Sequence, residues 1–524
     1  MDKPQRAKSR YDTLRSFRDG YLDVARRASA LTLPYLIRQD DEDPLNRKVL
    51  ITPWQSVGAK GVNVLSSKLM LALMPIQTSF FKLQLDESKM EDEQLDPQIK
   101  SEIDLSFSKI ERTINDLISA SDDRVIIFQA LKHLVVAGNA LVFMGKEGLK
   151  MYPLNRYVVN RDGNGNVLEI VTREKINKKI VEQTLGIPLE DKNKPIIPEQ
   201  DGDNPSNEVD VYTHVKRENN RVVWHQEVDG KILPKTIGKA PIETNPWIVL
   251  RFNTVDGEPY GRGRVEEYMG DLKSLEALSQ AIVEGSAAAA KVVFVVSPSS
   301  TTKPQTLATA GNGAIVQGRP DDIGVVQVGK TADFRTAAEM STQLEKRISD
   351  AFLILNVRQS ERTTAEEVRM TQQELEEQLG GLFSLLTVDF LVPYLNRKLS
   401  MAQKQGEIPA IPKKIVKPTI VAGLNAIGRG QDLESITQFV TTISQTMGPE
   451  AVQEYVQPEE LVKRLAAAQG IDTLNLVKTP EQVQEQGQQA QQQAEQMEMT
   501  KQAGQFAQIE ASQPQQQPGE PPNA

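Results

Sequence analysis

The sequence contains no cysteine among its 524 residues. This absence excludes disulfide bonds, thiol catalysis and cysteine-based zinc sites, and it suits a reducing compartment. Histidine is also scarce, because only His133, His214 and His225 occur. They lie too far apart in the sequence to form a spaced ligand pair. We therefore expect core or surface roles for all three, and we predict neither a metal nor a cofactor.

An excess of basic charge is also missing. The chain has 61 Lys and Arg against 70 Asp and Glu, which gives a formal net charge of -9. Proteins that hold nucleic acid over a broad face are usually basic. Any contact with DNA is therefore expected to be local. The length allows two to four domains with a sizeable core.

The chain lacks a recognisable export signal and a long apolar run. Its first residues are charged throughout, so no signal peptide is predicted. The best membrane candidate, residues 125–144, is interrupted by Gln129, Lys132 and Asn139, and we interpret it as a buried helix. A basic helix near Tyr11 could lie on a membrane. Its interleaved acidic residues favour packing on its own domain instead.

The stretch "TPWQSVGAKGVNVLSSKLMLALMP", residues 52–75, has glycines around a lysine before an apolar run. A phosphate-binding loop needs a glycine directly before Lys-Ser or Lys-Thr. Neither Lys60 nor Lys291 follows a glycine or precedes a hydroxyl residue. The apolar residues from Val62 to Leu73 recur at helical spacing, which predicts the start of a packed helix.

Other chemical motifs also fail. The "DGNGN" segment, residues 162–166, begins like a calcium loop, but Val167 and Arg173 stand where an EF-hand needs glycine and glutamate. A β-turn is the better interpretation. The carboxylate-rich run "AEEVRMTQQELEEQ" predicts a solvated helix face. Because no nucleophile, paired acid and base, or metal set is present, we predict that the chain is not an enzyme.

Periodicity predicts an α+β fold that is mainly helical. Strand-like alternation covers residues 146–252, and long helical stripes precede and follow it. Thr363 and Glu366 form a capping box at the start of a long helix that reaches about Gln405. Gly380, Gly381 and Pro393 interrupt that helix, and such residues are where long helices bend. The Gln-rich end, residues 481–524, is predicted to be disordered or loosely helical.

Several segments resemble the head-to-tail connector (portal) proteins of short-tailed, podovirus-type (autographivirus-like) bacteriophages. They include residues 52–75 and the segments "LTLPYL", "GEPYGRGRVEEYMGDLKSLE", "QGRPDDI", "RTTAEEVRMTQQELEEQLGG" and "PTIVAGLNAIGRGQDL". They follow the family's order from about Tyr11 to Ile471. The Gln-rich tail lies outside the resemblance.

The resemblance implies a ring, usually a dodecamer, at one capsid vertex. Double-stranded DNA would pass through the channel of this ring during packaging and ejection, and its contacts with the ring would not depend on the DNA sequence. Implied partners are the terminase large subunit, tail tubular or adaptor proteins, scaffold, major capsid protein and internal core proteins, with no membrane. The protein would reside in the virion after synthesis in the host cytoplasm. Two alternatives stay open: a non-conducting capsid or tail ring protein, and a DNA-processing enzyme, which the missing motifs disfavour.

The family's architecture divides the chain as follows. The wing takes residues 1–262, with a β-rich part near 146–252. The first stem helix takes residues 263–290, the clip takes residues 291–330, and the second stem helix takes residues 331–355. A tunnel loop, the long kinked helix and a closing strand take residues 356–424. Crown helices take residues 425–480, before the tail.

The resemblance also suggests which residues would contact DNA. Arg358 and Arg362, in the tunnel loop, are predicted to form basic rings that face the channel. Arg369, Lys346 and Arg347 are further candidates. The alternative for each is an ordinary surface charge paired with a nearby acid. A bend at Gly380 and Gly381 is expected to let the loop move as a valve, with Pro393 as a further hinge residue of the long helix.

Overall fold

The structure is a computed structural model, and it divides into two units, residues 1–426 and residues 427–524. It describes residues 6–38, 50–75, 79–85, 97–185, 208–289, 293–299, 303–311, 323–326, 331–354, 380–409, 416–420 and 429–448, with single residues between 315 and 321 and between 456 and 465. Within the second unit, the described part includes the helix α13 (Arg429–Met447).

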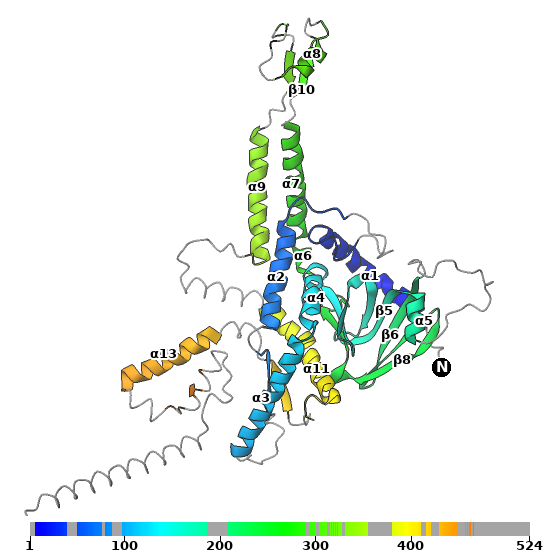
Figure 1. Cartoon of the computed structure of the whole chain (residues 1–524), viewed down its shortest axis with the longest axis vertical. Helices are drawn as coiled ribbons and strands as arrows, with labels where there is room; N and C mark the ends of the chain where they lie inside the picture. Colours follow the sequence, from blue (N-terminus) through cyan, green and yellow to red (C-terminus); the bar gives the residue numbers. More distant parts are fainter. Residues whose placement is uncertain are drawn as a thin grey trace, which may run out of the picture. The chain divides into compact units, whose positions relative to one another are not determined.

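Four helices of the first unit precede its main sheets (Figure 1). They are α1 (Ala7–Ala30), α2 (Val57–Leu73), α3 (Pro97–Ser119) and α4 (Asp123–Ala137). The buried side chains of α1 include Tyr11, Leu14 and Leu22. This burial confirms that α1 packs on its own domain, as its interleaved charges predicted.

Two antiparallel sheets make up most of the β structure. The first has the order β3-β2-β9, and the second has the order β4-β5-β6-β7-β8. Their strands are β2 (Asn139–Met144), β3 (Leu149–Tyr152), β4 (Tyr157–Arg161), β5 (Val167–Asn177), β6 (Glu208–Glu218), β7 (Arg221–Val228), β8 (Lys231–Pro241) and β9 (Trp247–Arg251). Short 3-10 turns, Leu154–Arg156 and Ile242–Thr244, and the helix α5 (Lys178–Leu185) lie between strands. The turn at residues 162–166 joins β4 to β5, which confirms the β-turn interpretation.

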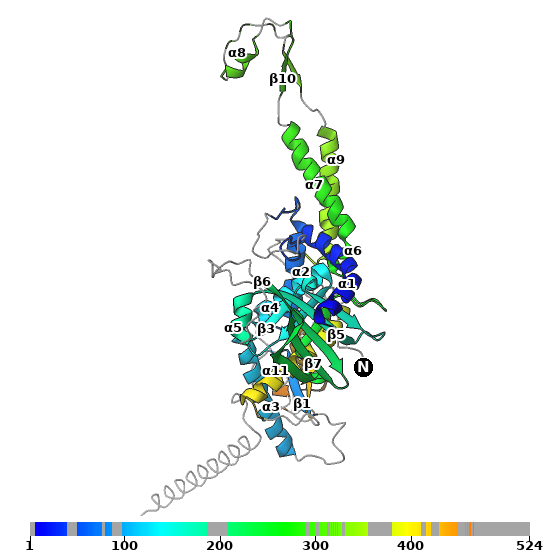
Figure 2. The same ribbon diagram turned by 90° about the vertical axis from the view of Figure 1, so that its right-hand side faces the viewer.

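Two long helices follow the sheets. After the short α6 (Arg264–Glu267), α7 (Met269–Ala289) runs beside α9 (Thr331–Ala351), as both views show (Figures 1 and 2). Beyond their far ends lie β10 (Val293–Val296), β11 (Ile323–Val326) and α8 (Pro304–Thr309). β10 and β11 pair antiparallel.

A further helix closes the first unit. Residues 380–386 are α-helical, Thr387–Leu391 form a π-helical segment, and α11 (Val392–Gln405) continues the same helix. The chain then returns as β12 (Val416–Ile420), which pairs antiparallel with β1 (Phe81–Leu85). The strand predicted around Ile420 is therefore confirmed.

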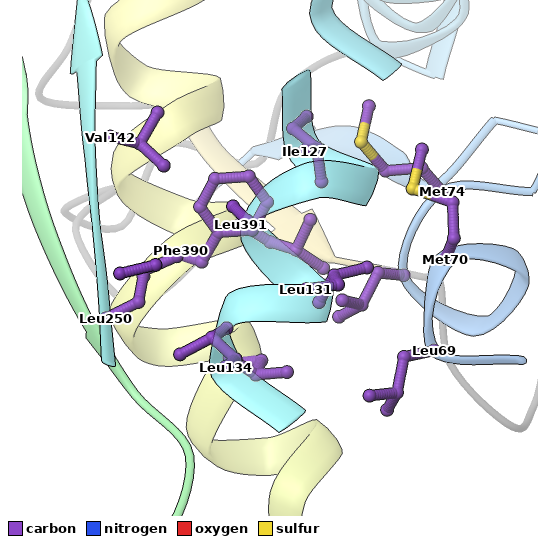
Figure 3. Close-up of a cluster of buried hydrophobic side chains, with 14 of the residues drawn as sticks. Leu69, Met70, Met74, Ile127, Leu131, Leu134, Val142, Leu250, Phe390 and Leu391 are labelled. Carbon is purple, nitrogen blue, oxygen red and sulfur yellow. The ribbon is translucent and has the colours of Figure 1, made fainter. Parts of the chain in front are cut away.

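The largest core surrounds α4. Figure 3 shows α4 between α2, the strands β2 and β9, and the π-helical segment. Leu131 and Leu134 of α4 are fully buried, and so are Leu69 of α2 and Leu391 of the π-helical segment. A helix that is apolar on nearly all sides is stable only when other elements cover it. The core therefore needs segments that lie more than 250 residues apart in the sequence.

Three boundaries differ from the sequence prediction. Residues 125–144 are not one buried helix, because α4 ends at Ala137 and β2 follows. The first long helix is interrupted at Tyr268, between α6 and α7. The second ends at Ala351 and not at residue 355.

The break after α4 has a clear cause. Gly138 adopts φ 71°, a left-handed conformation that ends helices and favours glycine. A Cβ there would lie 2.4 Å from the carbonyl carbon of Arg262. Asn139 then binds Gly261 through both ends of its side-chain amide, at 2.6 and 2.7 Å. This distant contact, invisible in the local apolar pattern, turns the chain into β2.

Candidate functional site

The lysine between two glycines near residue 60 belongs to the start of α2, as predicted. Gly58 and Gly61 are buried against other elements. A Cβ at Gly61 would lie 2.7 Å from the ring of Phe352, and one at Gly58 would lie 2.9 Å from the carbonyl oxygen of Leu31. The glycines therefore serve close packing between elements, and they do not form a phosphate loop.

The base of the α7–α9 pair is firmly packed. Leu272 and Leu275 of α7 and Ile348 of α9 are fully buried. The rings of Tyr268 and Phe352 lie 6.1 Å apart at the same end. Beyond this base, Val283 of α7 and Met340 at the middle of α9 are each 51% exposed. The far part of this pair therefore presents apolar surface that the described residues of the chain do not cover.

The end of α9 is held by two cations. Lys68 of α2 donates to the carbonyl oxygen of Leu353 at 2.6 Å, and Arg264 of α6 donates to that of Ala351 at 3.2 and 3.3 Å. Positive groups near a helix C-terminus satisfy its last carbonyl groups and oppose the negative end of its dipole. Leu353 has φ 57°, a left-handed conformation that is costly for a side chain of this size. Its surroundings therefore fix where the chain leaves α9.

The predicted DNA-facing residues divide into two groups. Lys346 and Arg347 lie on α9 and are exposed. Arg347 forms an ion pair with Asp271 of α7, so part of its charge is compensated within the chain. Arg358, Arg362 and Arg369 lie outside the described residues. The channel role of all five residues therefore stays a prediction.

The predicted hinge residues lie on the helix of residues 380–405. Gly380 and Gly381 are both helical there, and a Cβ at either would meet nothing within 4 Å. Pro393 is the second residue after the π-helical segment, and the N–H of the intervening Val392 donates to the carbonyl oxygen of Thr387. Single-turn π segments occur often at functional sites. The irregular backbone lies just before Pro393, and no sequence pattern predicted a π-helical segment there.

A buried polar cluster fixes α11 to α4. Asp123 accepts hydrogen bonds from Tyr394 Oη and Lys398 Nζ, each at 2.6 Å. Burial, together with the Asp123 carboxylate, raises the pKa of Tyr394 well above its ordinary value. The phenol therefore stays a donor. Sequence reasoning missed this cluster, because its members stand about 270 residues apart in the chain.

Two of the three histidines also meet. His214 and His225 are opposite each other on β6 and β7, with ring centroids 5.5 Å apart. Glu169 of β5 lies 2.6 Å from His214 Nε2 and accepts a hydrogen bond from Arg10 of α1 at 2.8 Å. Burial alone would raise the pKa of Glu169, but the bonds from His214 and Arg10 hold it below its ordinary value. The contacts of His214 with His225 and Glu169 join different strands, so the spacing of these residues in the sequence did not predict them.

A cavity of about 720 Å³ opens between α1, the β4–β5 turn and the loop of residues 254–259. Arg161 and Arg251 both line it. Burial, and then the neighbouring Arg251, lower the pKa of Arg161 to about 10. Arg161 donates to the carbonyl oxygens of Pro259 and Gly165 at 3.0 and 2.7 Å. The Nε atom of Arg251 is buried and has no hydrogen-bond partner among the described residues.

Within the described residues, no helix combines the length and apolarity that crossing a membrane requires. No group of three or more histidine and acidic side chains in the same residues is placed to hold a metal ion.

Comparison with known proteins gives a consistent answer. Residues 4–476 match the model of a family described as bacteriophage head to tail connecting protein. The chain is 39% identical over 490 residues to the portal protein of Escherichia phage T7, which covers 91% of this chain and 89% of the relative. It is 39% identical over 488 residues to the portal protein of Enterobacteria phage T3, with the same coverage. It is 30% identical over 436 residues to that of Enterobacteria phage SP6, covering 82% of this chain and 81% of the relative.

Structural similarity is weaker. A chain from the neck of an empty gene transfer agent particle aligns with a TM-score of 0.40 at 12% identity, covering 78% of this chain and 89% of that chain. A likeness at this level carries no argument about assembly.

Proposed function

This chain belongs to the family of bacteriophage head to tail connecting proteins, and from that premise we propose that it forms the DNA-conducting ring of a phage head. Its function is that of a portal, a structural component of the virion at the connection between head and tail. The observation that carries this conclusion is the identity of 39% to portal proteins over nine tenths of the chain.

The proposed ring has twelve subunits and contacts in which the front of one subunit meets the back of the next. The exposed apolar side chains at the far part of α7 and α9 support this assembly, because they require a partner to leave water. In this proposal α7 and α9 are the stem helices, and the segment with β10, α8 and β11 is the clip. The β-rich sheets belong to the wing, and the helices after residue 425 form the crown.

The channel must pass DNA without holding it. Each phosphate contact adds a salt-dependent increment to affinity, and contacts repeated around a ring would multiply. We propose that Arg358 and Arg362 face the duplex and that Lys346, Arg347 and Arg369 contribute less. The pairing of Arg347 with Asp271 supports this order, because a compensated charge attracts phosphate less. Such contacts carry no base-sequence information.

We propose that the partners of the ring bind at two different places. The terminase large subunit and later the tail tubular or adaptor proteins dock on the clip, while scaffold, major capsid protein and internal core proteins contact the head side. The chain is made in the host cytoplasm before assembly. We propose no catalytic step for it, so purified protein should show no ATP hydrolysis above a buffer control.

Cryo-EM of the purified protein tests the ring and the channel together. We expect class averages of rings around an opening wide enough to admit B-form DNA. A map in which Arg358 and Arg362 point away from the opening would contradict the proposed DNA contacts. A closed ring without such a path would favour the alternative of a non-conducting structural ring.

The hinge proposal has its own test. Replacing Gly380 and Gly381 together by alanine should stiffen the helix, because alanine restricts the backbone that glycine leaves free. The open space around both positions means that the change brings no clash. If DNA retention in filled particles is unchanged, the valve role of these glycines is wrong.

A further inference from the structure

Two exposed apolar side chains precede α2. Ile51 is 88% exposed and Trp54 is 50% exposed. Tryptophan is among the residues that most often dominate the energy of protein interfaces. Together with the residues between them, Ile51 and Trp54 form a short apolar projection, which we call the 51–54 loop.

The backbone beside this loop is held firmly. Glu276 of α7 accepts hydrogen bonds from the N–H groups of Trp54 and Gln55, at 2.9 and 3.3 Å. The side chain of Gln55 donates to the carbonyl oxygen of Leu31 at 2.6 Å and accepts from the N–H of Gly58 at 2.8 Å. A group already fixed in place loses little conformational entropy when it binds. The backbone that carries Trp54 is therefore already ordered before binding.

The same chain contains a concave surface whose mostly polar wall also carries apolar side chains and two arginines. The cavity beside α1 has exposed apolar side chains at its wall, with Phe17 65% and Val255 43% exposed. Its volume of about 720 Å³ lies within the range of pockets that enclose compact groups. The flat guanidinium groups of Arg161 and Arg251 also line it, and such groups attract the face of an indole.

The loop and the cavity of one chain cannot meet each other. Gln55 fixes the loop to Leu31 at the C-terminal end of α1, whereas Phe17 stands fourteen residues earlier on the same helix. At 1.5 Å per residue this separation is roughly 20 Å. Each copy therefore carries two different surfaces, which is the arrangement that a front-to-back ring contact needs.

We propose that the 51–54 loop of one copy enters the cavity of the next copy in the ring. Trp54 lies against Phe17 and Val255, and its indole stacks on the guanidinium groups of Arg161 and Arg251. The contact removes the two exposed apolar surfaces from water together. It rests on the ring of the proposed function and adds the residues through which neighbouring subunits recognise each other.

The absence of cysteine makes a selective cross-linking test possible. Thr52 lies between the two apolar side chains, and Thr254 lines the cavity; both are exposed. Two single variants, Thr52→Cys and Thr254→Cys, leave Trp54, Phe17 and Val255 in place. After treatment with a short bismaleimide, we expect covalent dimers only when the two variants are mixed. The double variant should give a ladder of products that ends at the ring.

Controls separate this contact from the ring itself. Lys235→Cys, on the exposed edge strand β8, replaces Thr254→Cys as the partner and should give no dimer. Rings in electron micrographs without cross-links between residues 52 and 254 would overturn the contact and leave the ring standing. Dimers from either single variant alone would indicate a two-fold contact and would also overturn it. A protein that forms neither rings nor cross-links contradicts both proposals.

A substitution provides an independent measurement. Trp54→Ala should raise the subunit concentration needed for half-assembly at least about tenfold, because a central interface tryptophan commonly contributes that much. Ile232→Ala, at an exposed apolar residue of β8, is the matched control and should leave assembly unchanged. Equal effects of the two variants would contradict a specific role for Trp54. Circular dichroism checks that both monomers are folded.

Discussion

The helix α4 and the α7–α9 pair show two ways in which a long helix is made stable. Other elements of the same chain cover α4, and its N-terminal Asp123 is bound by Tyr394 and Lys398 from α11. Among the described residues, those that cover the α7–α9 pair lie near its base, and Val283 and Met340 further along are half exposed. The comparison separates a helix that its own chain covers from a helix pair that keeps apolar side chains exposed in the single chain.

The largest expected effect concerns two ion pairs of similar chemistry. Asp123→Ala leaves Lys398 without its partner in a mostly buried site, which should cost about 3–5 kcal/mol of unfolding free energy. Asp271→Ala breaks the exposed pair with Arg347 and should cost about 1 kcal/mol or less. Urea unfolding of the unassembled protein measures both. Similar losses in the two variants would show that α4 and the α7–α9 base do not differ as described.

A second test compares two positions of α7. Leu272→Ala creates a cavity at the fully buried base and should cost about 2–5 kcal/mol of unfolding free energy. Val283→Ala, at a half-exposed position, should change the stability of the monomer by about 0.5 kcal/mol or less. If the far part of α7 packs against a neighbour, Val283→Ala instead lowers the stability of rings towards urea. Unchanged rings would argue against burial of Val283 on assembly.

Acid titration tests the burial of α4. His133 is fully buried, and burial lowers its pKa from 6.5 to about 4. Below pH 6.5 His133 binds a proton in the unfolded chain, whereas in the folded chain it does so only below about pH 4. The free energy of unfolding therefore decreases as the pH falls across that window. The loss should reach roughly 3 kcal/mol. His133→Leu should remove this part of the slope in urea midpoints measured against pH; an unchanged slope would place the titrating group elsewhere.

The smallest expected effects concern glycines. Gly61→Ala should cost about 1–3 kcal/mol of unfolding free energy, because its Cβ would lie 2.7 Å from Phe352. Gly20→Ala, in open space on α1, should stabilise by about 0.5–1 kcal/mol. Urea midpoints of the two variants should therefore move in opposite directions. A stabilising Gly61→Ala would show that α2 does not press on the end of α9.

The sequence could predict elements whose signal is local. The apolar stripe from Val62 to Leu73 predicted α2, and the "DGNGN" segment predicted the turn between β4 and β5. The prediction of one helix over residues 125–144 is wrong, because an apolar run fits a buried helix or a buried strand equally well. The contact of Gly138 with Arg262 and Gly263, which decides the question, joins residues more than 120 positions apart.

The sequence by itself determined the family of this chain, the existence of its two long helices, its lack of thiol chemistry and its modest negative charge. Motifs, periodicity and composition can be recognised from the order of the residues alone, and the pairing of the two helices was implied by the family resemblance. Only the tertiary structure decided which charges are paired, as with Arg347 and Asp271, and which apolar groups stay exposed, as with Trp54. The physical reason is that burial and pairing are set by packing between segments, and no local pattern states which segments will meet.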